Sequence, residues 1–133
     1  MVSVVITTHG KLATTFLDVA ESVLGKQEAV VAVDVLPQEG KEEILQHLKQ
    51  AVSRVQQQDG VLILAGIFGE SDCQISLSLF RGNGIRVVTG LNLPMLLKVL
   101  THRSDLDLNA LAASACESGK AGIIDCGLDS TGV

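Results

Sequence analysis

The residue of this sequence best suited to chemistry is His9, which stands in the polar segment Thr-Thr-His-Gly at residues 7–10. An apolar run precedes this segment, and residues 11–24 after it carry apolar side chains at the spacing of an amphipathic helix. Imidazole exchanges its proton between about pH 5 and 8, so it offers a nucleophilic nitrogen near neutral pH. The N–H groups and the dipole at a helix start favour an anion, such as a phosphoryl group on that nitrogen. The segment therefore indicates phosphoryl transfer, and a histidine that only caps the strand is the alternative.

Glycine-containing turns could hold the phosphoryl oxygens around this histidine. Phosphoryl transfer depends on positioning and charge stabilisation more than on covalent machinery. Glycine lets a backbone approach a ligand closely, and it recurs in the turns after three of the apolar runs. These turns are residues 7–10, 66–71 and 90–93. We expect Thr8, Gly10, Gly69 and Ser71 to bind the phosphoryl group.

Apolar runs alternate along the chain with segments of helical spacing. Four runs rich in Val and Ile are predicted strands, at residues 2–7, 29–36, 60–65 and 85–89. Their nearly continuous apolar character is typical of parallel strands that are covered on both faces. Helices are predicted at residues 11–24, 39–58 and about 72–80. A fourth helix is predicted to start at Pro94. A fifth is predicted to begin after a cap at Asp105 or Asp107 and to end at Gly119.

The order of these elements predicts an α/β fold. We expect a single domain over residues 1–133, built on one doubly wound open sheet of four central parallel strands with helices on both faces. The apolar stretch 121–126 is predicted to add a short edge strand, and residues 127–133 a loose tail. In such sheets chemistry gathers at the carboxyl ends of the strands, where His9 is expected.

Composition excludes several classes of function. The net charge of −5 and the presence of three Phe as the only aromatic residues argue against a nucleic-acid surface. No apolar run approaches the roughly 20 residues of a membrane-spanning helix, and the first residues lack the pattern of a signal peptide, so we expect a cytoplasmic protein.

Familiar catalytic and ligand-binding motifs are missing. The sequence has no Gly-x-x-x-x-Gly-Lys-Ser/Thr loop, no Gly-x-Gly-x-x-Gly turn after the first strand, and no Gly-x-Ser-x-Gly elbow. His9, His47 and His102 are not spaced as metal ligands, so no metal site is predicted. We expect His47 to be solvated and His102 to interact with a helix dipole. The three cysteines, Cys73, Cys116 and Cys126, form no Cys-x-x-Cys pair and are expected to be reduced.

Several segments, taken together, resemble the mannose-type IIA component of the bacterial phosphoenolpyruvate-dependent sugar phosphotransferase system. The resemblance covers essentially residues 1–126. It is carried by the strand that ends in Thr8-His9-Gly10, by Ala-Glu-Ser-Val-Leu-Gly at 20–25, by Gly-Val-Leu-Ile-Leu at 60–64, and by Gly-Leu-Asn-Leu-Pro-Met-Leu at 90–96.

The resemblance implies a phosphocarrier. A phosphohistidine carrier protein would phosphorylate His9, and a IIB component would then accept the group for sugar uptake, without a small-molecule cofactor and with indirect membrane association through the transporter. In similar proteins a last strand crosses to the partner of a homodimer, and residues 121–126 match it here. Regulatory relatives and binding modules without phosphoryl chemistry are the alternatives.

One position departs from the family pattern. Relatives usually carry an Asp at the end of the third strand, which orients the active histidine, whereas this chain has Gly66. Glu70 and Asp72 bring carboxylates toward this position, where they could orient the ring or repel the phosphoryl group, and our hypothesis is that Asp72 is the substitute orienter of His9. Phe68, Leu91 and Asn92, on turns next to the histidine, are predicted to face the partner proteins.

Overall fold

The computed structural model describes residues 1–55, 58–67 and 84–127. Its strands are β1 (Ser3–His9), β2 (Val30–Val35), β3 (Val61–Ala65) and β4 (Ile85–Val88). They form one sheet in the order β2-β1-β3-β4, and every neighbouring pair is parallel. The four central strands and the open parallel sheet expected from the sequence are thus confirmed.

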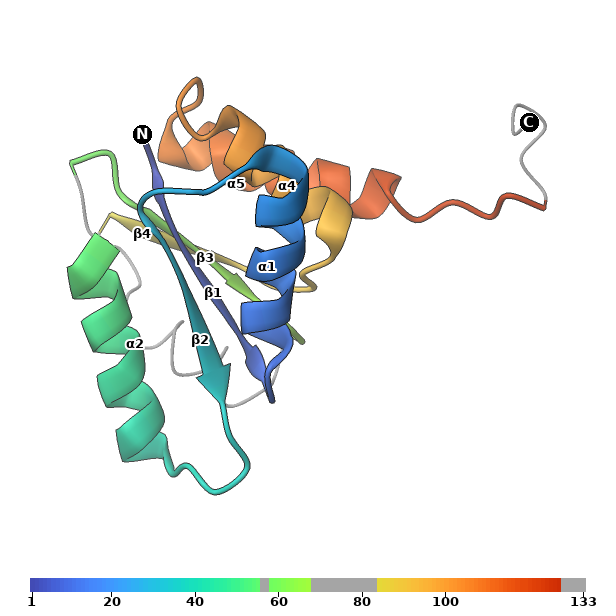
Figure 1. Cartoon of the computed structure of the whole chain (residues 1–133). Coiled ribbons are helices and arrows are strands. Elements are labelled where there is room, and N and C mark those ends of the chain that lie inside the picture. The colour runs from blue at the N-terminus through green and yellow to red at the C-terminus, as the bar shows by residue number, and fades with distance from the viewer. Residues whose placement is uncertain (56–57, 68–83, 128–133) are drawn as a thin grey trace.

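Helices cover both faces of this sheet. They are α1 (Leu12–Leu24), α2 (Lys41–Val55), α4 (Leu93–His102) and α5 (Leu108–Ala121). Helices α1, α4 and α5 lie on one face, and α2 lies on the other (Figure 1). The helix predicted near residues 72–80 falls outside the described residues. Within the described part, no helix combines the length and apolar character needed to span a membrane.

The central strand β1 shows why the strands read as continuous apolar runs. Val4 and Ile6 belong to the core between the sheet and α1, α4 and α5, whereas Val5 belongs to the core under α2. All three side chains are fully buried. Burying such a side chain is worth about 1.5–3 kcal/mol, so both faces of the strand require apolar residues.

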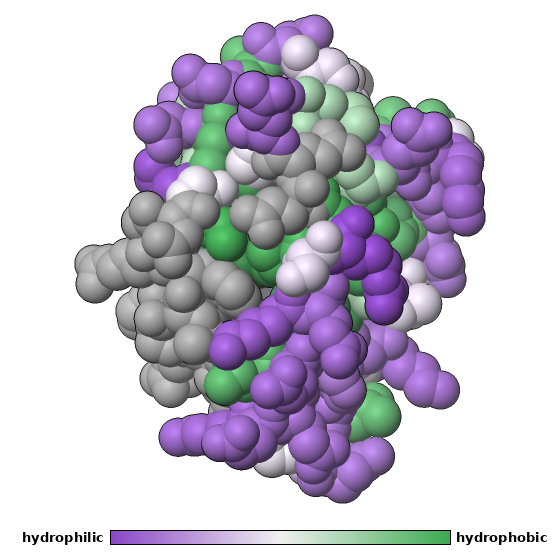
Figure 2. Space-filling view, turned by 90° about the vertical axis from the view of Figure 1, so that its left-hand side faces the viewer, coloured by the Kyte–Doolittle hydropathy of each residue, from purple (hydrophilic) through white to green (hydrophobic). Residues whose placement is uncertain are grey.

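Helix α2 is apolar on one side only. Ile44, Leu48 and Val52 are buried against the sheet, at spacings of four residues. Figure 2 looks onto this side of the molecule, where hydrophilic side chains make up most of the described surface. The helix is therefore held by its apolar stripe and presents Lys, Glu and Gln to water.

The ends of α4 and α5 follow local signals, with one exception. Pro94 lies in the first turn of α4, and Asp107, one of the two predicted caps, accepts a hydrogen bond from Ala110 N at 2.8 Å at the start of α5. The predicted stop at Gly119 is wrong, because α5 continues to Ala121. Gly119 is buried inside the helix, where a Cβ would lie 2.8 Å from Met95 Cε, so the glycine serves close helix packing.

The predicted edge strand at residues 121–126 is also wrong for a single chain. Ala121 closes α5, and the residues after it form no strand as far as Gly127. Ile123 and Ile124 are 78% and 61% exposed, and the segment leads away from the sheet (Figure 1). A strand needs a neighbour for its backbone groups, and no strand in the described part of the chain pairs with this segment. Most of the predicted tail, residues 128–133, falls outside the description.

Candidate functional site

His9 lies at the switch point of the sheet. From β1 the chain first adds β2 on one side, and it then returns to add β3 on the other side of β1. Open α/β sheets bind ligands in the crevice that this reversal creates at the carboxyl ends of the strands. His9 is the last residue of β1, and it is exposed after six buried residues. The fold thus brings the predicted nucleophile to solvent at the position where such sheets place their chemistry.

The turn that follows His9 is short and depends on a glycine. Gly10 has φ of +64°, a conformation that residues with a Cβ adopt only at a cost. Its N–H donates a hydrogen bond to Val35 O at 2.9 Å, which ties the turn to the end of β2. Helix α1 then begins at Leu12, so His9 precedes the start of a helix by three residues.

Thr8 brings a buried hydroxyl to the same turn. Its side chain is 2% exposed, and its Oγ1 makes no hydrogen bond to any described residue. By the alternation of β1, Thr8 shares the sheet face of Val4 and Ile6, on which α1 packs. Such a group carries a desolvation cost that a hydrogen-bonding ligand would relieve, which is compatible with the phosphate-binding role predicted for Thr8.

Two neighbouring turns lie at the same edge of the sheet. Gly90 N donates to Gly66 O, and Leu91 N donates to Ala65 O at 3.1 Å, so the segments that leave β3 and β4 run side by side. Ile67, in the first of these segments, is 66% exposed. The predicted site residues in the rest of that segment fall outside the described part. They are Phe68, Gly69, Ser71 and Asp72, whose roles remain predictions.

The residues predicted to face a partner, Leu91 and Asn92, also have roles within the chain. Leu91 is partly buried against the core. Asn92 caps α4, since its Oδ1 accepts a hydrogen bond from Met95 N at 3.0 Å, and its Nδ2 donates to Gly119 O at 2.9 Å. Both lie in the turn after β4, at the same edge as His9, and their contact with a partner remains a prediction.

The other two histidines lie in separate surroundings. His47 on α2 is half-exposed, with Nδ1 2.7 Å from Glu39 Oε2, and His102 at the end of α4 has Nδ1 3.6 Å from Asp105 Oδ2. Each therefore has a carboxylate neighbour, which sequence reasoning did not anticipate. Nowhere among the described residues do three or more potential metal ligands gather.

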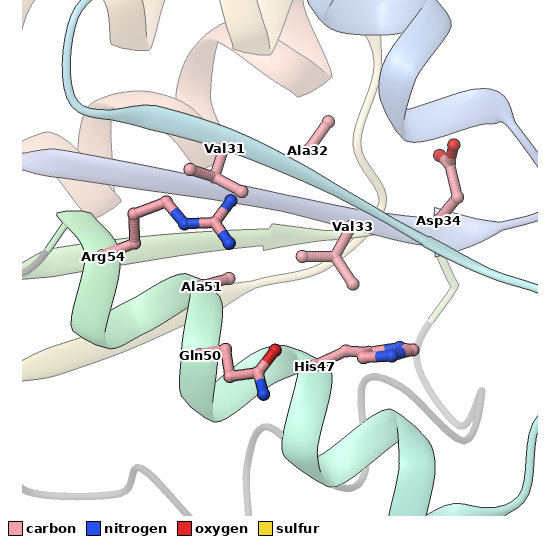
Figure 3. Close-up of a pocket in the computed structure, with 8 residues that line it drawn as sticks. All are labelled: Val31, Ala32, Val33, Asp34, His47, Gln50, Ala51 and Arg54. Atoms are coloured by element: carbon pink, nitrogen blue, oxygen red, sulfur yellow. The ribbon is translucent and has the colours of Figure 1, made fainter.

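A hollow of about 230 Å³ lies between the edge strand β2 and α2, apart from His9. Figure 3 shows His47, Gln50 and Arg54 along its helix side and Val31 and Val33 along its strand side. It opens on the outer side of β2, whereas the crevice at the switch point lies between β1 and β3. Sequence reasoning placed no function here. Of the residues that line the hollow, Asp34 lies next to the histidine turn, because its register partner on β1 is Thr8.

Asp34 is the residue near the site that sequence reasoning missed. It interrupts the apolar strand β2 next to its last residue, and its register partner on β1 is Thr8. Its carboxylate binds Thr14 in the first turn of α1. A lone acidic residue at the carboxyl end of an otherwise apolar strand was the available signal.

Fold and site together define an α/β protein with a histidine at the switch point, and comparison with known proteins gives the family. Residues 3–116 match the family model EIIA-man, described as PTS system fructose IIA component. The chain belongs to this family, the mannose-type IIA components of sugar phosphotransferase systems, as its resemblance indicated.

Individual relatives agree with this assignment. The chain is 32% identical over 124 residues to the PTS system mannose-specific EIIAB component of Escherichia coli K12, covering 92% of this chain and 38% of that relative, so it spans about two fifths of its length. It is 29% identical to the PTS system fructose-specific EIIA component of Bacillus subtilis 168, covering 84% of this chain and 77% of the relative.

A solved structure has the same fold. The phosphotransferase system component EIIA from Streptococcus agalactiae superposes with a TM-score of 0.89 at 24% identity, covering 97% of this chain and all of that one. These comparisons place the chain in the IIA component family of sugar phosphotransferase systems.

Proposed function

We propose that this chain is a phosphocarrier whose acceptor is His9. The observation that carries the proposal is an exposed histidine at the end of β1, at the switch point of the sheet, in a member of the mannose-type IIA family. His9 receives the phosphoryl group from a phosphohistidine carrier protein and passes it to a IIB component. The role in sugar uptake belongs to the assembled system.

The proposed step moves one phosphoryl group between two imidazoles. The neutral ring nitrogen of His9 attacks phosphorus, a P–N bond to His9 forms, and the P–N bond to the donor histidine breaks, which returns the donor ring to its neutral form after proton exchange. No redox step or small-molecule cofactor enters this balance. Exposure of His9 meets the first requirement, because two rings on two proteins must approach the same phosphorus atom.

The residues around His9 have roles that suit this step. The buried Thr8 hydroxyl and the N-terminus of α1 are proposed to donate hydrogen bonds to the oxygens of a transferred phosphoryl group, whereas Gly10, whose N–H bonds Val35 O, shapes the turn that binds the group. Gly69 and Ser71 are proposed as further ligands of these oxygens, and Asp72 as the group that orients the ring. Phe68, Leu91 and Asn92 are proposed to contact the partner proteins.

The decisive experiment follows label from radioactive phosphoenolpyruvate through enzyme I and the carrier protein to this chain. We expect wild type to acquire an acid-labile, base-stable label and His9→Gln to acquire none. His47→Gln is the matched control, since His47 is a half-exposed histidine on the remote helix α2, and it should be labelled like wild type. Label on His9→Gln, or none on wild type with donors active on a control acceptor, would refute the proposal.

A second stage separates transport from regulation. Labelled chain is purified from the donors and mixed with a IIB component of the mannose type. Transfer of label to IIB supports the uptake role. A chain that accepts label but does not pass it to its cognate IIB would be a regulatory relative.

We also propose that two chains exchange their C-terminal segments, as the family resemblance implies. Strand β4 is the last strand of the described sheet, and a hollow of about 320 Å³ lies between its outer side and α5. Ile123 and Ile124 follow the same helix, and their apolar side chains are exposed to solvent. Pairing of residues 121–126 from a second copy along β4 would bury these side chains and complete the sheet edge.

This exchange predicts a dimer that depends on the segment. Ile124→Asp should shift the molecular mass measured by light scattering from dimer to monomer, because a buried unpaired carboxylate is costly. Val23→Asp is the control, since Val23 is also 61% exposed but lies on α1. A monomeric wild type, or a dimer that Ile124→Asp leaves unchanged, would contradict the exchange.

A further inference from the structure

Helix α1, which follows the phosphoryl acceptor, has no cap from its own chain segment. Lys11 occupies the N-cap position without a side-chain hydrogen bond, and the first turn of the helix holds no acidic residue. N-cap side chains normally accept a hydrogen bond from the second or third N–H of the helix. The start of α1 therefore depends on a group from elsewhere.

Asp34 on β2 supplies that group. Its Oδ1 accepts a hydrogen bond from Thr14 N at 3.1 Å, and its Oδ2 accepts one from Thr14 Oγ1 at 2.6 Å. Thr14 is the third residue of α1, so the carboxylate takes the place of an N-cap side chain. Figure 3 shows this carboxylate turned away from α2 and the hollow beside it, toward the start of α1.

The same end of β2 also holds the turn that carries His9. Thr8 and His9 pair in the sheet with Asp34 and Val35, and Gly10 N donates to Val35 O at 2.9 Å. The segment from the acceptor to the first turn of α1 is thus attached to two consecutive residues of β2. One attachment is a backbone bond at Gly10 and the other is the Asp34 carboxylate at Thr14.

We propose that Asp34 is a positioning residue for the acceptor histidine, an inference that rests on the proposed function. The carboxylate fixes the start of α1 against β2, and this fixes the turn between β1 and α1 on which the imidazole is mounted. Phosphoryl transfer between two rings depends on alignment of the reacting atoms, so small displacements of the turn are costly in rate. The carboxylate acts through Thr14 and needs no contact with the ring.

The test measures the rate of phosphorylation by the carrier protein as a function of carrier concentration. Asp34→Ala removes both hydrogen bonds, Thr14→Val removes the hydroxyl bond alone, and Thr14→Ser keeps it. Asp34→Asn keeps an acceptor for Thr14 N and removes the charge. The matched control is Thr15→Val, because Thr15 is an exposed threonine next to Thr14 and its hydroxyl donates to Lys11 O, at 3.0 Å, and to no other described residue.

We expect Asp34→Ala to lower the saturating rate about tenfold with an unchanged half-saturating concentration of carrier. Thr14→Val should lower it by a smaller factor, and Asp34→Asn should recover most of the rate. Thr14→Ser and Thr15→Val should match wild type. Equal rates for Asp34→Ala and Thr15→Val, or a change confined to the half-saturating concentration, would overturn the proposal. If Asp34→Ala fails to fold, Thr14→Val measured against Thr15→Val decides.

A second measurement tests the positioning role of Asp34 without any phosphoryl transfer. Hydrogen exchange of the Gly10 amide reports on the turn itself, and Asp34→Ala should accelerate it about tenfold relative to Thr15→Val when global stability is matched by temperature. If wild type accepts no label, the proposed function fails while this exchange still decides whether Asp34 holds the turn. Unchanged exchange at Gly10 would overturn the positioning role.

Discussion

Among the described residues, the two ends of the sheet differ. We call the amino ends of the strands the closed end, because buried side chains and hydrogen bonds join them, and the carboxyl ends the open end, because His9 is exposed there. At the amino ends, Val2 N bonds Arg103 O and Ser3 N bonds Gly60 O, each at 3.0 Å. Ser3 is fully buried and Arg103 is 4% exposed. At the carboxyl ends, by contrast, His9 is exposed. The closed end therefore contributes to the stability of the fold, and the open end presents the proposed phosphoryl acceptor.

Arg103 is the centre of the closed end. From the turn after α4, its guanidinium donates to the carbonyls of Val2, Glu28 and Ala29, and to Gln27 Oε1, at 2.5–3.5 Å. Burial lowers the pKa of this guanidinium, and the negative charge of Glu28 partly opposes that shift. The side chain joins the first strand to the segment between α1 and β2, far from His9 along β1.

The largest effect on stability is expected from Arg103→Met. The substitution leaves three carbonyl groups without their donor, which should lower the free energy of unfolding by about 3–4 kcal/mol. Arg103→Lys keeps the charge but not the planar fork, so its loss should be smaller. Urea unfolding measures both. The folded fraction should be phosphorylated at the wild-type rate. A lower rate would show that the closed end also affects phosphoryl transfer at His9.

The same substitution at two glycines compares the ends directly. Gly60 lies at the closed end with φ of +92°, and a Cβ there would lie 2.8 Å from Gly84 O and 3.0 Å from Leu108 Cδ2. Gly10 lies at the open end with φ of +64°, and a Cβ there would have no atom within 4 Å. We expect Gly60→Ala to cost about 2–3 kcal/mol of unfolding free energy and Gly10→Ala about 1 kcal/mol.

Transfer rates should show the opposite order. Gly10→Ala strains the turn that carries His9, so it should slow phosphorylation, whereas folded Gly60→Ala should be phosphorylated like wild type. Thermal unfolding and the labelling assay on the same samples give both quantities. Equal losses of unfolding free energy at the two glycines would mean that the contacts of a Cβ at Gly60 add no cost beyond the backbone strain that both positions share.

The sequence was sufficient for features that depend on local chemistry. Continuous apolar runs predicted parallel strands because burial on two faces leaves no polar alternation, and Pro94 and Asp107 marked helix starts through backbone geometry and capping. The position of His9 followed from one strand, one turn and one helix. None of these requires knowledge of a distant partner.

Three failures involve contacts between residues that are distant in the sequence. Gly119 looked like a helix stop, but Met95 and Asn92 of α4 pack against it and the helix continues. The stretch 121–126 has the composition of a strand but pairs with no strand among the residues that the structure describes. Asp34 binds Thr14 twenty residues away, and neither residue alone indicates that the start of α1 needs a cap from β2.

The smallest effect on stability is expected from Asn92→Ser, at a residue of the open end that also has a structural role. Asn92 caps α4 and bonds Gly119 O, so Asn92→Ala should cost about 1–2 kcal/mol of unfolding free energy. Asn92→Ser keeps a capping oxygen and loses only the bond to α5, so its cost should be below about 1 kcal/mol. Chemical denaturation of the two variants measures the difference.

Asn92→Ser also tests whether this residue faces a partner. A side-chain amide has two N–H donors and two acceptor lone pairs, and the bonds to Gly119 and Met95 use one of each. One donor and one acceptor therefore remain at a half-buried position next to the turn of Leu91. If the carrier protein bonds them, Asn92→Ser should raise the half-saturating carrier concentration about threefold, the equivalent of a weak hydrogen bond, with the saturating rate unchanged. An unchanged half-saturating concentration would mean that Asn92 has a structural role alone. The turn after β4 would then stabilise the fold at this residue, although it lies at the same end of the sheet as His9.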